Sequence, residues 1–247
     1  YNHHHSGRFD FSTGINFNRN WPDLAECIIS EDGEIIKNLT QDVEENKNKV
    51  LSAVEKWISN QKPITALERL RLEIIKIAMG CDVVLDLHCD VQALNHIYIV
   101  PQLMPKYQDL ADWMGSYVTL TAENSGGGSF DEIWPRLWID MQRRCPDKPI
   151  PKPVLSATLE YRGLVDVEIS LNRKDAENLM GFFSSRGFVN SITDNTCSPM
   201  PPALPFNATQ IIKSEVTGLV CYEVQLGQDV TEGELIANIL LLDGPEA

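Results

Sequence analysis

The sequence contains no run of apolar residues near the roughly 20 needed to span a bilayer, and it opens without a basic-then-apolar leader. Its six cysteines include no Cys-x-x-Cys pair, which argues against a disulfide framework in 247 residues and favours the reducing cytoplasm. Positive charge is also scarce, with 21 Lys and Arg against 35 Asp and Glu and a net charge of −14. Such a surface repels phosphate backbones and anionic lipids, so we expect neither a nucleic-acid nor a membrane partner. An anionic substrate would then depend on a few arginines inside a pocket, and Arg8 and Arg19 are the candidates.

The composition is that of an ordinary folded protein, with 43% hydrophobic and 23% charged residues. Apolar residues at intervals of three, four and seven predict amphipathic helices, and we expect helices at 42–61, 67–79, 107–118, 131–144 and 172–186. Pro135 predicts a kink or a break in the fourth. Apolar, β-branched runs predict buried strands at 82–87, 96–100 and 154–161. Helices that alternate with buried strands indicate an α/β sheet covered on both faces.

The composition changes after residue 197. Four prolines between residues 197 and 205 exclude a helix and indicate a linker, so we expect a main domain at 1–197 and a small β-module at 206–247. Glycines about ten residues apart in the second part are typical of small all-β modules. This part resembles half of a lipoyl- or biotinyl-type sandwich. Lys213 does not lie in the turn that carries such a prosthetic group, which favours a structural role for it.

A histidine and an acid at the end of one strand form the first group of candidate residues. Asp86 and His88 lie two positions apart, so their side chains share one face of the strand. Ligands of open α/β sheets bind at the carboxyl ends of strands. The alternative is a core histidine satisfied by hydrogen bonds, and the pattern alone leaves both interpretations open.

Two further groups contain residues that suit catalysis or substrate binding. Glu160 ends another apolar strand, where partial burial would raise its pKa toward the range of a general base; an ion pair with Arg162 is the alternative. Asn18 and Arg19 offer an amide and a planar guanidinium, which suit bidentate binding of a carboxylate.

Three motifs together resemble those of the zinc carboxypeptidase superfamily in their order and approximate spacing. They are Asn18-Arg19-Asn20-Trp21, Asp86-Leu87-His88 and Leu159-Glu160-Tyr161-Arg162-Gly163. Within this superfamily the chain is more similar to the succinylglutamate desuccinylase/aspartoacylase family. The resemblance extends from about Arg8 to the end of the chain. It implies a zinc-carboxypeptidase-like mixed sheet flanked by helices, followed by the small barrel-sandwich-like module.

The resemblance also implies a Zn²⁺-dependent deacylase that cleaves the amide of an N-acyl amino acid or a similar small molecule. His88 would be one of three metal ligands and Glu160 the general base. Arg8 would stabilise the oxyanion, and Asn18 with Arg19 would hold the substrate carboxylate. A carboxypeptidase acting on peptides and a non-catalytic member without the metal are the alternatives. The sequence leaves the oligomeric state open, a homo-oligomer included.

Two of the family's metal ligands come from an early His-x-x-Glu stretch, which this sequence lacks. The histidines before Arg8 are His3, His4 and His5, and no glutamate accompanies them. Three consecutive histidines are typical of a tag remnant or a loop. Because the sequence also begins at Tyr1 without a methionine, we expect the natural start, and the missing ligands, upstream.

Overall fold

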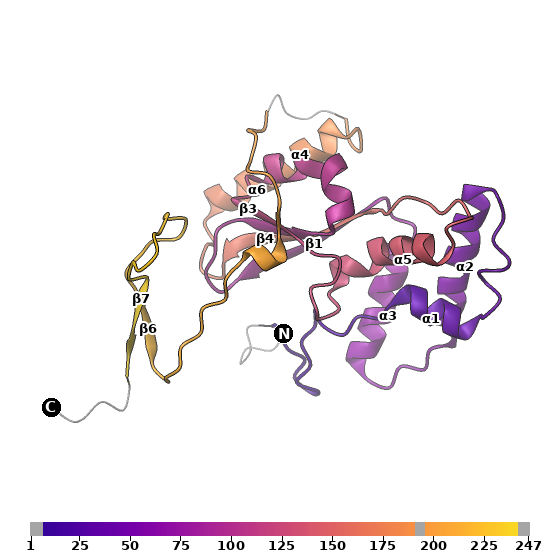
Figure 1. The fold of residues 1–247 in the computed structure, drawn as a ribbon, viewed down its shortest axis with the longest axis horizontal. Helices are drawn as coiled ribbons and strands as arrows, with labels where there is room; N and C mark the ends of the chain where they lie inside the picture. The colour runs from indigo at the N-terminus through magenta and orange to yellow at the C-terminus, as the bar shows by residue number, and fades with distance from the viewer. Residues whose placement is uncertain (1–6, 191–195, 242–247) are drawn as a thin grey trace.

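The structure, a computed structural model, describes residues 7–190 and 196–241. A five-stranded mixed sheet in the order β1-β4-β2-β3-β5 forms its centre (Figure 1). The strands are β1 (Val83–Asp90), β2 (His96–Ile99), β3 (Val118–Thr121), β4 (Leu155–Gly163) and β5 (Leu204–Pro205). β4 runs parallel to β1 and antiparallel to β2, whereas β2, β3 and β5 are parallel. The predicted α/β fold with a mixed sheet is thereby confirmed.

Helices lie on both sides of this sheet. On one side are α1 (Leu24–Glu31), α2 (Val43–Asn60), α3 (Ala66–Ala78) and α5 (Phe130–Arg144), which share a hydrophobic cluster around Trp134. On the other side are α4 (Met104–Met114) and α6 (Ile169–Ser185), which pack around Phe182 (Figure 1).

The alternation of side chains along β4 separates the core from the site. Leu155, Ala157 and Leu159 are buried in the cluster beneath α4 and α6. Thr158 and Glu160 point to the opposite face, where they line a cavity. Because side chains of a strand alternate between faces, one sequence run both fills the core and presents polar groups to the site.

Local sequence signals set the helix ends. Asp42 begins α2 by accepting a hydrogen bond from the amide of Glu45, and Thr65 and Glu68 form a reciprocal capping box at the start of α3. Gly115 ends α4 in the left-handed conformation at φ 60°. The helices expected at 42–61, 67–79 and 172–186 are thus confirmed, with ends within one to three residues.

Some expectations were wrong in detail. The helix expected at 107–118 stops at Met114, because Gly115 turns the chain and the β-branched run from Val118 joins the sheet as β3. The helix expected at 131–144 is present as α5, but it runs through Pro135 without a break. β1 is not a fully buried strand, because it lies at the sheet edge, where Leu87 is 58% exposed. α1, which Asp23 caps, was not foreseen.

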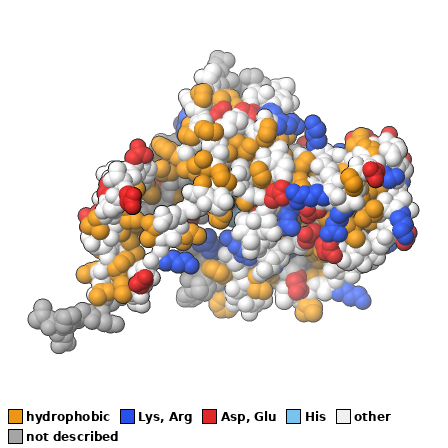
Figure 2. Space-filling model, in the orientation of Figure 1, with side chains coloured by type: hydrophobic (Ala, Val, Ile, Leu, Met, Phe, Trp, Pro, Cys, Tyr) orange, Lys and Arg blue, Asp and Glu red, His pale blue; other side chains and the backbone are white. Residues whose placement is uncertain are grey.

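The proline-rich segment and the chain beyond it have two parts. Leu204 and Pro205 pair with β3 as β5, and a 3-10 turn (Phe206–Ala208) follows. β6 (Leu219–Tyr222) and β7 (Ala237–Leu240) then form a separate two-stranded antiparallel sheet, with apolar side chains on its surface (Figure 2). The division into domains at 1–197 and 206–247 stays a prediction. No helix of the described residues has the length and apolar character needed to cross a membrane.

Candidate active site

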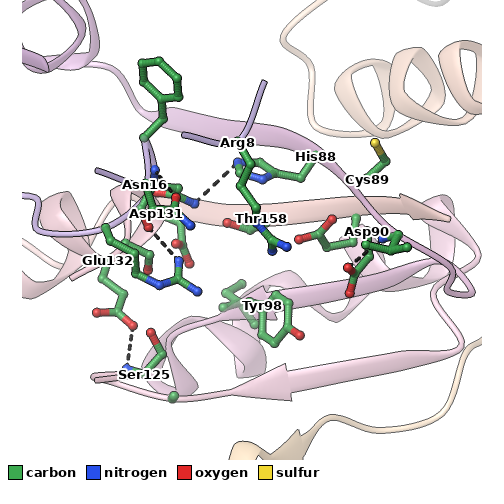
Figure 3. A pocket seen from close by; sticks show the side chains of 18 of the residues that line it. Arg8, Asn16, His88, Cys89, Asp90, Tyr98, Ser125, Asp131, Glu132 and Thr158 are labelled. Atoms are coloured by element: carbon green, nitrogen blue, oxygen red, sulfur yellow. Dashed lines mark hydrogen bonds between the residues drawn. The ribbon is translucent and has the colours of Figure 1, made fainter. Parts of the chain in front are cut away.

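A cavity of about 590 Å³ opens at the carboxyl ends of β1 and β4. It is bounded by the loop at residues 7–19, the strand ends, the first turn of α5 and the segment after β5 (Figure 3). Five of the residues singled out from the sequence line it: Arg8, Asn18, Arg19, His88 and Glu160. The structure therefore brings together groups that lie up to 152 positions apart in the sequence.

His88 is held by a carboxylate and an amide. Its Nε2 lies 2.7 Å from Oδ2 of Asp86 and 3.5 Å from Nδ2 of Asn18. The hydrogen bond with Asp86 raises the pKa of His88, although burial acts in the opposite direction. The shared strand face expected for Asp86 and His88 is thus confirmed. Because Nε2 is engaged in this way, Nδ1 is the ring nitrogen left for a ligand.

A β-bulge follows His88 in β1. The pairing with β4 runs in register from Val83 to His88 and shifts before Asp90. A bulge turns side chains away from strict alternation. As a result His88, Cys89 and Asp90, three consecutive residues, all line the cavity (Figure 3).

Asn18 links the loop, the strand and the helix. Its Nδ2 donates to Oδ2 of Asp86 at 3.3 Å, and its Oδ1 accepts from the backbone amide of Phe130 at 2.7 Å. That amide belongs to the first residue of α5, where no partner exists within the helix. Both ends of the Asn18 amide are therefore committed to the protein, so Asn18 orients Asp86 and α5, and its predicted contact with substrate stays a prediction.

Glu160 lies between two histidines on the neighbouring strands of the sheet. In the sheet it is paired with His88 on one side and with His96 on the other. Burial raises the pKa of Glu160, and the positive charge of His88 and His96 opposes this shift. Its buried Oε2 has no hydrogen-bond partner among the described residues. A buried carboxylate oxygen without a partner is costly, so a water molecule, an ion or a substrate group is expected beside it.

The alternative ion pair between Glu160 and Arg162 does not form. Arg162 adopts a left-handed backbone at φ 60° and turns to α6, where it pairs with Asp175. Its Nη1 also donates to Oδ1 of Asn95 at 3.0 Å. Glu160 consequently faces the cavity without a neutralising arginine from its own strand.

Two buried acids in the first turn of α5 were missed by the sequence analysis. Asp131 is 5% and Glu132 3% exposed, and both line the cavity (Figure 3). Burial raises the pKa of Asp131 to about 6, although a hydrogen bond with Ser129 lowers it. Oε1 of Glu132 accepts from the amide of Ser125 at 2.7 Å. Acids in a first helical turn are common on surfaces, so no sequence pattern indicated that these two are buried.

The two arginines of the cavity have no carboxylate partner among the described residues. Nη1 of Arg19 donates to the carbonyl of Asn18 at 2.6 Å, and Arg19 as a whole is exposed. A Cβ at Gly127 would come within 2.5 Å of Cδ of Arg19, so a glycine lets this arginine lie against the loop. Arg8, Thr158 and Tyr98 point toward the middle of the cavity from different sides (Figure 3).

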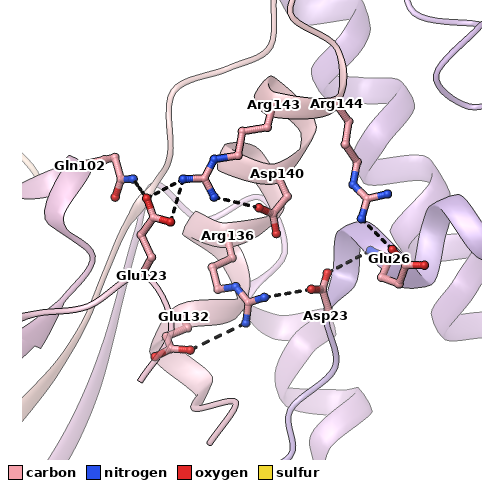
Figure 4. Close-up of polar contacts among 9 residues, drawn as sticks. All are labelled: Asp23, Glu26, Gln102, Glu123, Glu132, Arg136, Asp140, Arg143 and Arg144. Atoms are coloured by element: carbon pink, nitrogen blue, oxygen red, sulfur yellow. Dashed lines mark hydrogen bonds and ion pairs between the residues drawn. The ribbon is translucent and has the colours of Figure 1, made fainter. Parts of the chain in front are cut away.

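Ion pairs fix the helix that carries the buried acids. Nη2 of Arg136 lies 3.0 Å from Oδ2 of Asp23, and Nη2 of Arg144 lies 2.7 Å from Oε2 of Glu26, which join α5 to α1 (Figure 4). Nη1 of Arg136 is 3.9 Å from Oε2 of Glu132, too far for a hydrogen bond. These exposed or half-exposed pairs contribute modestly to stability and add to the apolar packing of Trp134 and Leu137, which holds α5 in the core.

The described residues do not complete a zinc centre. They contain no group of three or more His, Cys, Asp or Glu side chains arranged to hold a metal. Zinc sites in enzymes use three protein ligands. His88, backed by Asp86, has the arrangement of one such ligand. His3, His4 and His5 lie outside the described residues.

Known structures share this fold. A Shewanella frigidimarina NCIMB 400 protein, proposed to be a succinylglutamate desuccinylase/aspartoacylase, is 24% identical with a TM-score of 0.75; the match covers 96% of this chain and 63% of that one. A Shewanella amazonensis SB2B protein with the same proposed assignment is 23% identical with a TM-score of 0.73, covering 96% and 64%. A succinylglutamate desuccinylase from Silicibacter sp. TM1040 is 16% identical with a TM-score of 0.50, covering 75% and 55%.

The chain has the succinylglutamate desuccinylase/aspartoacylase fold. The sequence itself matches no model of a protein family and no curated protein. The chain spans a little under two thirds of the length of the two Shewanella proteins. The fold resemblance expected from the sequence motifs is thus confirmed.

Proposed function

We propose that this protein belongs to the succinylglutamate desuccinylase/aspartoacylase family and hydrolyses the amide bond of an N-acyl amino acid or a similar small amide. The observation that carries the proposal is the buried, unpartnered Oε2 of Glu160 in the cavity that His88 and two arginines also line. We also propose that the main part of the chain is a zinc-carboxypeptidase-like domain and that the part around β6 and β7 is a barrel-sandwich-like module.

Glu160 is the proposed general base. It takes a proton from a water molecule as the water oxygen attacks the amide carbonyl, and it later gives that proton to the departing amine. Arg8 stabilises the negative charge that develops on the carbonyl oxygen. The products are a carboxylic acid and a free amine, so one water is consumed for each bond broken. The raised pKa of Glu160 suits both halves of this proton transfer.

Zn²⁺ is the proposed cofactor, with His88 as the ligand from the described residues. Replacement of His88 by alanine is expected to lower the zinc bound per chain by more than tenfold, since loss of a direct ligand costs at least as much as loss of the groups behind one. Elemental analysis after dialysis measures this. His96→Ala is the matched control, because β4 separates the strand of His96 from that of His88 and His96 does not line the cavity. Equal zinc in both variants would remove His88 from the metal site.

The substrate class can be tested by kinetics. N-acyl amino acids with acidic and neutral acyl groups are compared with short peptides that carry a free carboxyl end. Cleavage of N-acyl amino acids supports the proposal, whereas cleavage of peptides alone would favour a carboxypeptidase. Binding of an N-acyl amino acid without its hydrolysis would indicate a non-catalytic member of the family.

Arg19 is the proposed clamp for the substrate carboxylate. Arg19→Lys keeps the charge but loses the planar pair of donors, so binding should weaken by about 1.5–3 kcal/mol. The measurement is KM for the acid substrate and for its methyl ester. Wild type should discriminate against the ester and the variant should largely cease to. Arg173→Lys on the exposed surface of α6 is the control, and unchanged discrimination in Arg19→Lys would make Arg19 a structural residue.

A further inference from the structure

One guanidinium nitrogen gathers the backbone of the loop that carries the proposed substrate-binding residues. Nη2 of Arg71, which projects from α3, donates to the carbonyl of Arg19 at 2.6 Å and to that of Asn16 at 3.0 Å. The carbonyl of Phe17 lies at 3.4 Å from the same atom. Three carbonyls within four residues thus converge on a side chain more than 50 positions away in the sequence.

The surroundings of Arg71 leave it no competing partner. Among the described residues it forms no ion pair, and its buried Nε has no hydrogen-bond acceptor. Burial lowers the pKa of Arg71, and its guanidinium carbon lies 5.6 Å from the ring centroid of Trp21, over which it stacks. All the hydrogen bonds that Arg71 forms with the described residues therefore go to the backbone of the loop.

Arg71 adds to the contacts that the loop makes by itself. Within the turn, the amide of Asn18 donates to Oδ1 of Asn16 at 2.9 Å and the amide of Arg19 donates to the carbonyl of Asn16 at 3.3 Å. On one side the amide of Phe17 donates to the carbonyl of Arg8 at 3.1 Å, and on the other Asn20 and Trp21 donate to the carbonyls of Gly127 and Gly128. Asn20 also adopts a left-handed backbone at φ 60°, an unfavourable conformation that its surroundings must hold.

We propose that Arg71 is a positioning residue that fixes the turn at residues 16–19, so that Asn18 reaches Asp86 and Arg19 faces the cavity. Its effect on substrate rests on the proposed function, but its effect on the loop does not. The three contacts converge on the single nitrogen Nη2, so a lysine ammonium could replace some of them, but it lacks the planar guanidinium that lies over the ring of Trp21. The arginine is therefore needed for its shape as well as its charge.

The test compares Arg71→Met and Arg71→Lys with Arg69→Met, an exposed arginine on the same helix. Hydrogen exchange followed by mass spectrometry reports on the amides of residues 16–21. We expect exchange there to become about tenfold faster or more in Arg71→Met, because charged hydrogen bonds are lost, and by less in Arg71→Lys. Exchange in α3 and the sheet should stay as in wild type, and Arg69→Met should change neither region.

Kinetics supply the second readout. KM for an N-acyl amino acid should rise about tenfold in Arg71→Met, while kcat falls less than threefold and KM for the methyl ester changes little. Unchanged exchange at residues 16–21 would overturn the positioning role. Faster exchange with an unchanged KM would show that Arg71 holds the turn, and it would overturn the proposed effect of Arg71 on substrate binding. If wild type hydrolyses no N-acyl amino acid, the proposed function fails, and the exchange result alone still decides whether Arg71 holds the turn.

Discussion

Replacement of Glu160 by glutamine is expected to lower kcat by about two to four orders of magnitude, the range usual for loss of a general base. Glutamine keeps the size of the side chain and can occupy the same place between His88 and His96 in the sheet. It cannot accept the proton of the attacking water. Steady-state kinetics with an N-acyl amino acid, at equal zinc content, measures the effect.

The pH profile gives an independent check of the same residue. Because a base acts in its deprotonated form and burial raises the pKa of Glu160, activity should rise with pH through a value above the ordinary range of a glutamate. The residual activity of Glu160→Gln should no longer show this rise with pH, the acidic limb of the profile. Glu55→Gln, on the exposed face of α2, should leave both kcat and the limb unchanged. Near-wild-type turnover in Glu160→Gln would exclude Glu160 as the base.

The parts of the site that could be predicted from the sequence are those that local rules specify. A histidine two positions after an acid on a strand must share its face, and the structure confirms the contact between Asp86 and His88. Glu160 follows the same logic, because alternation along β4 places it opposite the buried Leu159. Strand ends of a parallel pair meet at one edge, so these groups had to be neighbours once β1 and β4 paired.

The rest depended on contacts between distant segments, which no local pattern encodes. The hydrogen bond of Asn18 to the first amide of α5 spans 112 positions, and it turns a residue expected to touch substrate into one that also orients the protein. Asp131 is buried where the first turn of α5 lies beside Thr158 of β4, with which it shares a hydrogen bond. Phe206, the first residue after the segment interpreted as a linker, lines the cavity because β5 pairs with β3.

The charge distribution of the cavity explains why its few cations matter. Asp86, Asp131, Glu132 and Glu160 lie at or around it, within a chain of net charge −14. Their combined field disfavours a free anionic substrate, so Arg8 and Arg19 must compensate it locally. The same field favours a cation near His88, which is the position proposed for the metal.

Asp131 carries the clearest energetic consequence of this field. Burial, with Glu132 and Asp86 nearby, raises its pKa from the ordinary value of 3.8 to about 6, against hydrogen bonds from Ser129 and Thr158. The folded protein therefore binds a proton more tightly than the unfolded chain. Stability falls as pH rises through the window between these two values, and the loss is complete above the folded pKa.

Asp131→Asn should consequently be more stable than wild type by about 3 kcal/mol at pH 8, since each pKa unit corresponds to about 1.4 kcal/mol. At pH 5 the gain should be roughly half as large, because the unfolded chain has already lost its proton while the folded protein largely keeps it. Urea denaturation of the metal-free protein at several pH values measures the difference. Asp229→Asn, on the exposed surface before β7, is the control and should show no pH-dependent gain. A gain for Asp131→Asn that does not change with pH would mean that Asp131 is ionised at its ordinary pKa, and that the interior beside α5 is wetter than its burial indicates.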